Sequence, residues 1–179
     1  MFIGHLPAGY ITTYAIVGRC SGVSLETYRS LFGAGLVASV LPDFDLFYFY
    51  LFDGRQHLHH TYWTHLPAFW LVLLAGSVIL AGLLRNRLVW LFVAVIYANI
   101  FLHMLLDTLV GHILWLYPFS NQSFALFEVE SKYGWWVWNF VLHWTFLLEI
   151  ALWMGAVMLF WRRRRLSAAL NSEPAVEKR

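Results

Sequence analysis

The stretch FLHMLLDTLVGHILWLYPFS, from Phe101 to Ser120, decides how the rest of the chain is read. It is apolar enough for a membrane helix, yet it contains His103, Asp107 and His112. An ionisable side chain in hydrocarbon costs on the order of 2.5–3.5 kcal/mol, so such a residue usually faces a partner or a cavity. His103 and Asp107 are four residues apart and share one face of a helix. An imidazole and a carboxylate on one face are typical ligands of a divalent metal ion.

The composition places the chain in the membrane class. Of its 179 residues, 60% are hydrophobic and only 12% are charged, against about 25% charged in an average soluble domain. The ten Trp and nine Tyr residues suit a protein with much surface at the membrane–water interface. The net charge of +2 is too small to indicate nucleic-acid binding. Cys20 is the only cysteine, which excludes an internal disulfide.

Hydropathy predicts an all-α, multi-pass membrane bundle with about four membrane segments. Residues 1–18 are broken by Pro7 and Gly9, so we expect a re-entrant or interfacial segment there, with no cleaved signal peptide. We expect one membrane-embedded domain over residues 1–165, followed by a disordered cytoplasmic tail over residues 166–179. The four segments are Leu31–Phe52, Leu66–Leu84, Leu88–Leu116 and Trp135–Trp161. The third of them is either one long tilted helix or a helix that bends at Gly111.

The first of these segments is interrupted by polar residues. Pro42 removes a backbone donor and breaks the helix, and Asp43 and Asp45 follow it. Irregular backbone at membrane depth must be buried in protein or line a wet cavity. The alternative is an interfacial turn with a helix-capping aspartate. Two carboxylates within one apolar stretch favour a functional role.

The loop DGRQHLHHTYWTH, from Asp53 to His65, holds four of the eight histidines. Interface histidines or an adventitious metal-binding tract would explain one or two of them. Four within nine residues favour a site, and His65 stands at the entry of the next helix. We take His60 and His65 as candidate ligands from this loop.

Charge asymmetry predicts the orientation of the chain. Short loops rich in Lys and Arg stay in the cytoplasm, so the run Arg162–Arg165 places the C-terminus there. The loop Arg85–Arg87 falls on the same side, in agreement with its own charge. The helix rise of about 1.5 Å per residue then brings the candidates together in the outer half of the bilayer. These candidates are Asp43, Asp45, His60, His65, His103 and Asp107.

A set of histidines and aspartates suits zinc, manganese or a dinuclear site. A divalent ion lowers the pKa of water toward about 7 and polarises a phosphoryl or carbonyl oxygen. A carboxylate near that water can act as general base, and Asp45 is our candidate. The sequence shows no Ser-His-Asp arrangement and no glycine-rich phosphate loop.

Five short motifs occur in an order that resembles a known family, and the likeness extends to about Trp161. They are HLPAG at 5–9, LPDFD at 41–45, HHTYWTH at 59–65, HMLLD at 103–107 and YPFS at 117–120. The chain resembles the YdjM-type family, described as LexA-binding inner-membrane metal-dependent hydrolases, which itself looks distantly similar to zinc phospholipases C. The resemblance implies a bacterial inner-membrane protein. It also implies the metal ligands His5, Asp43, Asp45, His60, His65, His103 and Asp107.

The chain departs from the family pattern beside His60. Thr61 and Tyr62 stand where Arg and Gly are usual, and Leu66 stands where Ser is usual. These departures affect substrate contacts more than metal ligands.

Three functions follow as hypotheses. The first is a membrane-bound metal-dependent hydrolase, with zinc or manganese as cofactor and a membrane lipid or small phosphoester as substrate. The second is a non-catalytic metal-binding scaffold or carrier. The third is a haem protein that uses His103 and His143. The sequence leaves open the oligomeric state and whether other residues join the site, namely His57, His59, His112, His143 and Glu149.

Overall fold

The computed structural model describes residues 1, 3–57 and 59–172, with side chains described up to Arg165. Over these residues the chain forms seven α-helices and no β-strand, which confirms the all-α prediction. Short 3-10 turns at 42–44, 59–61 and 63–65 join some of them. The helices are α1 (His5–Val17), α2 (Leu25–Ala38), α3 (Asp45–Leu51), α4 (Pro67–Leu84), α5 (Arg87–Asp107), α6 (Trp136–Val141) and α7 (Phe146–Ser172).

Two of the described helices, α4 and α5, are long and apolar enough to cross a membrane. The helix α2 and the segment Pro42–Leu51 qualify only together, bent by 55° at the break, so they form a broken span or a re-entrant loop. The structure therefore supports two or three spans rather than about four. Although α7 is longer, Glu149 and the arginines from Arg162 onward leave too short an uncharged stretch between them.

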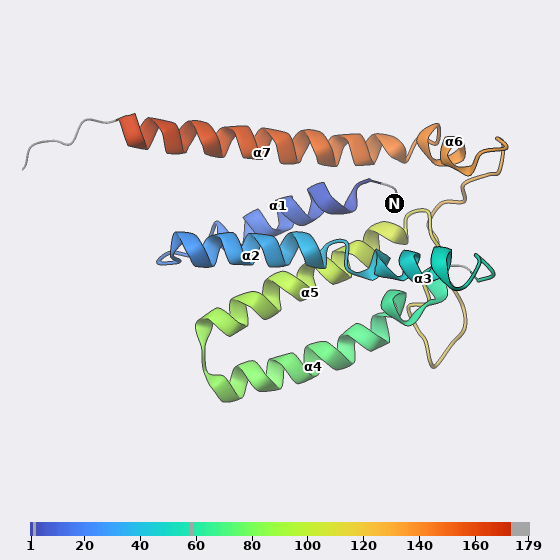
Figure 1. Ribbon diagram of the computed structural model, residues 1–179, viewed down its shortest axis with the longest axis horizontal. Helices are drawn as coiled ribbons and strands as arrows, with labels where there is room; N and C mark the ends of the chain where they lie inside the picture. Colours follow the sequence, from blue (N-terminus) through green and yellow to red (C-terminus); the bar gives the residue numbers. More distant parts are fainter. Residues whose placement is uncertain (2, 58, 173–179) are drawn as a thin grey trace, which may run out of the picture.

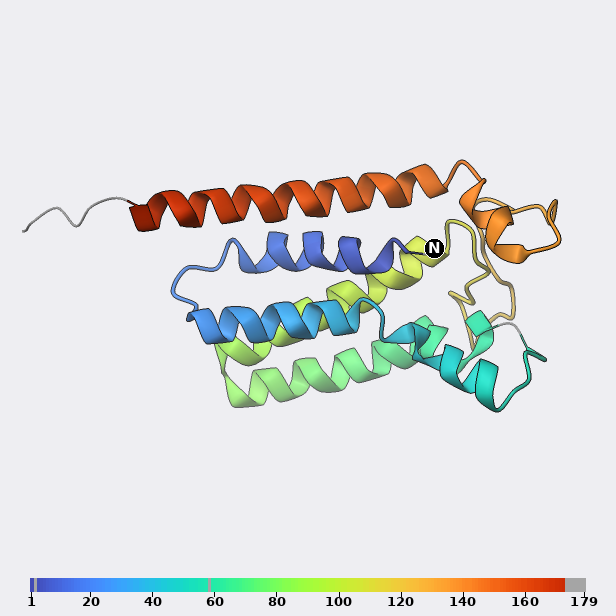
Figure 2. The same ribbon diagram turned by 45° about the horizontal axis from the view of Figure 1, so that its top comes forward.

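The long helices lie side by side along the long axis of the molecule (Figures 1 and 2). At the centre, α5 packs against α1, α2 and α4, while α7 packs on α1. Two buried apolar clusters hold this arrangement together, one of Val17, Leu31, Phe32 and Val95, the other of Ala38, Trp70, Ile100 and Met104. Both clusters include side chains of α5, so this helix is the framework on which the others are placed.

The N-terminal helix α1 is too short to span a bilayer and is packed into the bundle. Gly9 permits this packing, because a Cβ atom there would lie 2.4 Å from the Cβ of Ser39. The buried amide of Asn99 donates to the hydroxyl of Thr13 at 3.1 Å and ties α1 to α5. The close approach brings His5, at the start of α1, toward the end of α5.

Besides the first segment, whose helix α2 begins at Leu25 rather than Leu31, three expected boundaries differ. The helix α5 ends at Asp107 rather than Leu116, because the chain then folds back: Leu126 and Phe127 donate to the carbonyls of Thr108 and Leu109. The last predicted segment is divided between α6 and α7. The tail predicted from residue 166 begins as helix to Ser172, and residues 173–179 lie outside the described residues.

Candidate metal site

Four side chains converge where α5 ends: Asp43, His65, His103 and Asp107. Each offers one ligand atom, and these atoms all lie within 4.8 Å of one another. His103 and Asp107 come from α5, one helical turn apart. The other two come from the 3-10 turns that precede α3 and α4, and these segments meet at one end of the bundle (Figure 1).

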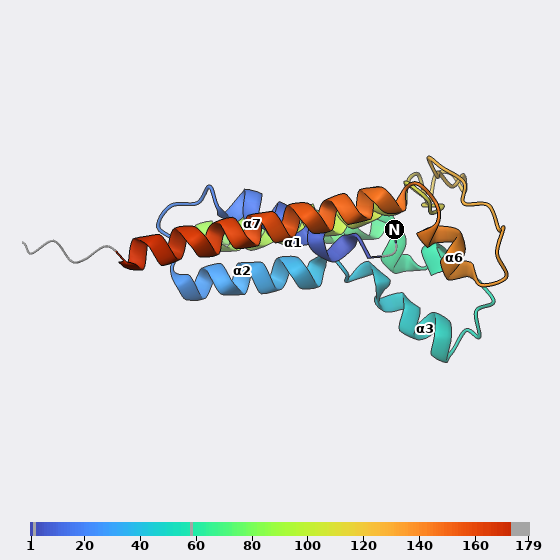
Figure 3. The same cartoon turned by 90° about the horizontal axis from the view of Figure 1, so that it is seen from above.

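Two prolines set the local backbone that carries these turns. Pro42 stands at the start of the turn Pro42–Phe44, where the chain bends away from the line of α2 (Figure 3). Leu66 precedes Pro67 and is extended, with φ −88° and ψ 114°, as steric contact with a following proline favours. His65 is therefore held at the end of its own turn rather than inside α4.

The converging atoms lie close together without forming hydrogen bonds. His103 Nε2 is 3.0 Å from Asp107 Oδ2 and 3.6 Å from Asp43 Oδ1. His65 Nε2 is 3.6 Å from Asp107 Oδ2 and 3.7 Å from Asp43 Oδ1. His65 Nε2, His103 Nε2 and Asp107 Oδ2 are buried and have no hydrogen-bond partner among the described residues. Since buried polar atoms are normally paired, this donor set fits a bound cation.

The far nitrogen of each histidine is held by a hydrogen bond. His103 Nδ1 lies 2.8 Å from the carbonyl oxygen of Ser39, so Nδ1 carries the proton and donates a hydrogen bond to that oxygen. The lone pair of Nε2 is then free to bind a metal ion. His65 Nδ1 lies 2.5 Å from Asp45 Oδ2, and Thr64 donates its hydroxyl to the same oxygen at 2.7 Å. A carboxylate behind a histidine is the usual way in which proteins orient a metal ligand. Asp45 therefore contacts His65 on the side away from the metal group, while its Oδ1 is buried and has no hydrogen-bond partner within the described part of the chain.

His5 and His60 approach the group through Asp107. His5 Nε2 lies 3.0 Å from Asp107 Oδ1, and its ring stacks on that of His103 at 3.8 Å. His60 Nε2 lies 3.7 Å from Asp107 Oδ2. Gly111 makes room for this ring, because a Cβ atom there would lie 2.5 Å from His60 Cε1. The amino group of Met1 also contacts Asp107 Oδ1.

The structure thus brings all seven predicted residues close together, but they do not all have the same place in the site. Four form the group with converging ligand atoms, two contact Asp107 beside it, and Asp45 contacts His65 from behind. The dinuclear alternative and the choice of metal stay predictions.

Of the residues that the sequence left open, His59 lies closest to the group. Its ring stacks on that of His65 with centroids 5.3 Å apart, a placement that no spacing rule would have indicated. His57 instead pairs with Asp53, with Nδ1 and Oδ1 2.7 Å apart. His112 lies 3.4 Å from a carboxylate oxygen of Glu128.

Glu149 is buried and accepts the backbone N–H of Ile3. The indole of Trp153, one turn further along α7, donates to the carbonyl of the same residue at 3.1 Å. These two contacts fix the segment that leads into His5, so α7 supports the site without entering the group.

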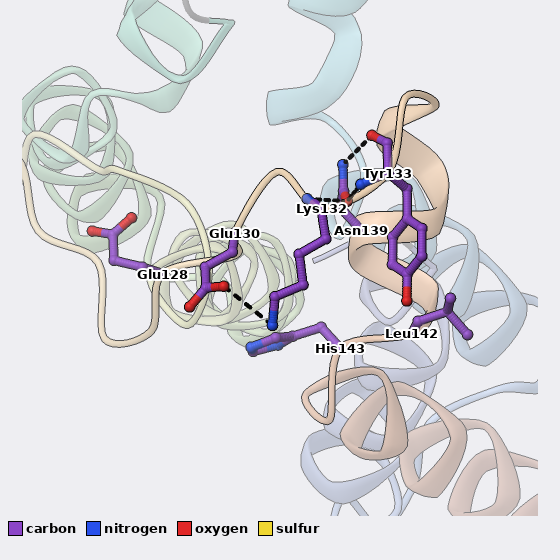
Figure 4. Close-up of a pocket in the computed structure, with 7 residues that line it drawn as sticks. All are labelled: Glu128, Glu130, Lys132, Tyr133, Asn139, Leu142 and His143. Carbon is purple, nitrogen blue, oxygen red and sulfur yellow. Dashed lines mark hydrogen bonds and ion pairs between the residues drawn. The ribbon is translucent and has the colours of Figure 1, made fainter.

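His143 belongs to a different feature, a pocket of about 180 Å³ beside α6 (Figure 4). Asn139 shapes it by accepting the backbone N–H groups of Lys132 and Tyr133 at 2.9 and 2.8 Å. Lys132 and Glu130, which also line the pocket, form an ion pair at 3.1 Å. His143 Nδ1 is 2.8 Å from the Thr145 hydroxyl. His143 and His103 therefore serve different parts of the molecule.

The metal group opens on one side. The side chains of His65, His103 and Asp107 are at most 2% exposed, whereas Asp43 is 28% and His60 is 21% exposed. The segment that follows Asp43, made of the end of its turn and α3, carries large exposed apolar side chains, namely Phe44, Phe47, Tyr48, Tyr50 and Leu51.

The carboxylates govern the protonation of His65, which lies before the span α4. Burial alone would lower its pKa, but its contacts with Asp107, Asp43 and Asp45 raise the pKa to about 11. The imidazole therefore carries a proton at neutral pH, and a cation that binds there must displace it.

Comparison with known proteins gives one family. The family model described as YdjM inner membrane protein matches residues 1–172, which confirms the resemblance drawn from the five motifs. No curated protein and no solved structure matches the chain.

Proposed function

We propose that this chain, which belongs to the YdjM inner membrane protein family, is a metal-dependent hydrolase embedded in the membrane. The observation that carries the proposal is the convergence of four ligand atoms within 4.8 Å, from side chains that are mostly buried. Two imidazole nitrogens and two carboxylate oxygens suit zinc, and manganese is the alternative. A divalent ion held there would lower the pKa of a water molecule and polarise a phosphoryl oxygen.

The side chains around the group supply the remaining functions. Asp45 is proposed as a positioning residue, because it holds the far nitrogen of His65. In this proposal Asp45 orients a ligand, whereas the sequence predicts it as the general base. His60 lies between Asp107 and the opening, within reach of a substrate that enters past Asp43. It is our candidate for contact with the phosphate or for proton transfer.

The opening supports an amphiphilic substrate, a phosphoester carried by a membrane lipid. Phe44, Phe47 and Leu51 are exposed on the segment that follows Asp43, and such side chains favour the interface of a bilayer over water. Arg162–Arg165 lie toward the other end of α7 from Glu149, which approaches the site (Figure 1). The positive-inside rule would then place the C-terminus in the cytoplasm and the metal group toward the outer leaflet.

The test is metal content followed by a hydrolysis screen of the detergent-purified full chain. We expect stoichiometric zinc or manganese in the wild type, and its loss in His103→Ala and Asp107→Asn. His112→Ala is the matched control, because that histidine pairs with Glu128 on the surface. The screen would use phosphate monoesters, phosphate diesters and glycerophospholipids, and turnover must be lost with the metal.

The outcomes separate the hypotheses. Bound metal with no turnover of any compound would favour the non-catalytic scaffold or carrier. Absence of a bound metal would refute both metal hypotheses, and a Soret band lost with His143→Ala would favour haem.

A further inference from the structure

The four arginines near the end of α7 point in different directions. The guanidinium of Arg163 lies over the ring of Tyr28, 4.0 Å from its centroid, and contacts the tyrosine hydroxyl. Arg163 thereby joins α7 to α2. Arg164 lies over the ring of Phe160, 4.9 Å from its centroid. The run Arg162–Arg165 therefore does more than set the orientation of the chain in the membrane, because Arg163 also packs against another helix.

The other two arginines line a shallow groove of about 630 Å³ on the surface of α7, together with Val157, Met158 and Trp161. These five positions follow the spacing of one helix face. The three apolar side chains are 45%, 69% and 54% exposed. Within the described part of the chain, neither Arg162 nor Arg165 has an acidic partner.

The groove faces away from the bundle. The opposite face of α7 packs on α1, where a Cβ atom added at Gly155 would lie 3.5 Å from Ile11 Cδ1 and where Ala156 is buried. The helices α4 and α5, which qualify as membrane spans, run along the same axis (Figures 1 and 2). The groove therefore presents apolar side chains on the outside of the bundle, parallel to the candidate spans, and at its edge two positive charges that have no acidic partner among the described residues.

We propose that this groove binds one anionic phospholipid. The phosphate would lie between Arg162 and Arg165, whose guanidinium groups match phosphate oxygens in geometry and charge. One acyl chain would lie along Val157 and Met158, with Trp161 at the level of the headgroup. A soluble anion would use the arginines alone, so the apolar wall indicates a lipid.

The proposal is tested by titrating the detergent-solubilised full chain with dioleoylphosphatidylglycerol and, separately, with dioleoylphosphatidylcholine. Native mass spectrometry counts the bound lipids. Each arginine near an anionic headgroup contributes about a fivefold change in affinity. Arg162→Gln and Arg165→Gln should therefore each weaken phosphatidylglycerol binding about fivefold. Arg164→Gln is the matched control, because it removes the same charge from the same run but outside the groove.

Met158→Asn completes the test of the apolar wall. It should weaken phosphatidylglycerol binding and leave the weak binding of glycerol 3-phosphate unchanged. An equal loss in Arg164→Gln would overturn the proposal, since nonspecific attraction to a basic segment would then suffice. Equal binding of the two lipids by the wild type would overturn it as well. All variants alter exposed side chains, and helix content by circular dichroism verifies that each is folded.

Discussion

Replacing Asp45 by asparagine is expected to weaken metal binding without abolishing it. Asp45 Oδ2 lies 2.5 Å from His65 Nδ1, and it accepts the Thr64 hydroxyl at 2.7 Å. The asparagine oxygen can still accept a hydrogen bond from His65, but the bond loses its charge. A charge-assisted hydrogen bond is about twice as strong as a neutral one. His65 would therefore be a weaker and less firmly oriented ligand.

The magnitude follows from the position of the carboxylate. Loss of the group behind a metal-binding histidine usually lowers metal affinity about 10–100-fold, which corresponds to about 1.4–2.7 kcal/mol. Loss of a direct ligand such as Asp107 should cost more, because a converging oxygen would disappear from the group. The two variants Asp45→Asn and Asp107→Asn should thus differ clearly in affinity.

The assay is competition for zinc between the purified protein and a chromophoric chelator at fixed pH. Asp53→Asn is the matched control, because it makes the same change in an Asp–His pair outside the metal group. An unchanged affinity in Asp45→Asn would refute the positioning role. Unchanged affinity with lost hydrolysis would restore Asp45 as general base, and complete loss of metal would make it a direct ligand.

Three further predictions concern packing, pH and the metal itself. Gly9→Ala should destabilise the protein by about 1–3 kcal/mol, because its Cβ would collide with Ser39. Thermal unfolding checks this, with Gly76→Ala as the control that should not be destabilised, because a Cβ there meets nothing within 4 Å and alanine favours the helix. Zinc affinity should rise with pH between about pH 6 and pH 8, because His65, with its pKa raised to about 11, must release a proton; a flat profile would contradict this. Chelation should lower the unfolding temperature of the wild type, by the equivalent of about 2.7 kcal/mol at a metal concentration 100 times Kd, and leave His103→Ala unchanged.

The local hydropathy pattern was enough to predict the helices that are apolar along almost their whole length. The span α4 has no charged residue over its length, and α5 keeps its apolar character to Asp107. Hydropathy failed beyond that point, because residues 108–127 are also largely apolar yet fold back on themselves. Their backbone groups pair with one another, as in the bridge between Ile113 and Phe124. An apolar loop closed in this way has the composition of a helix, so composition cannot separate the two.

In the candidate site, too, contacts between residues close in the sequence could be predicted, whereas contacts between distant segments could not. The pairing of His103 with Asp107 could be predicted, because a spacing of four residues puts both on one helix face. The position of His5 could not, since it depends on the close approach at Gly9 and on the bond from Asn99 to Thr13. Only the family resemblance indicated it.

The difference between Asp43 and Asp45 shows why a list of candidate ligands does not give their roles. The two carboxylates are two residues apart on one bent segment, and no spacing rule separates them. The first ends near the free nitrogens of His65 and His103, the second at the opposite nitrogen of His65. The chain bends at Pro42, and the hydroxyl of Thr64, from the turn before α4, donates to the second carboxylate only. A residue's part in such a site therefore follows from which atom of its neighbour it contacts.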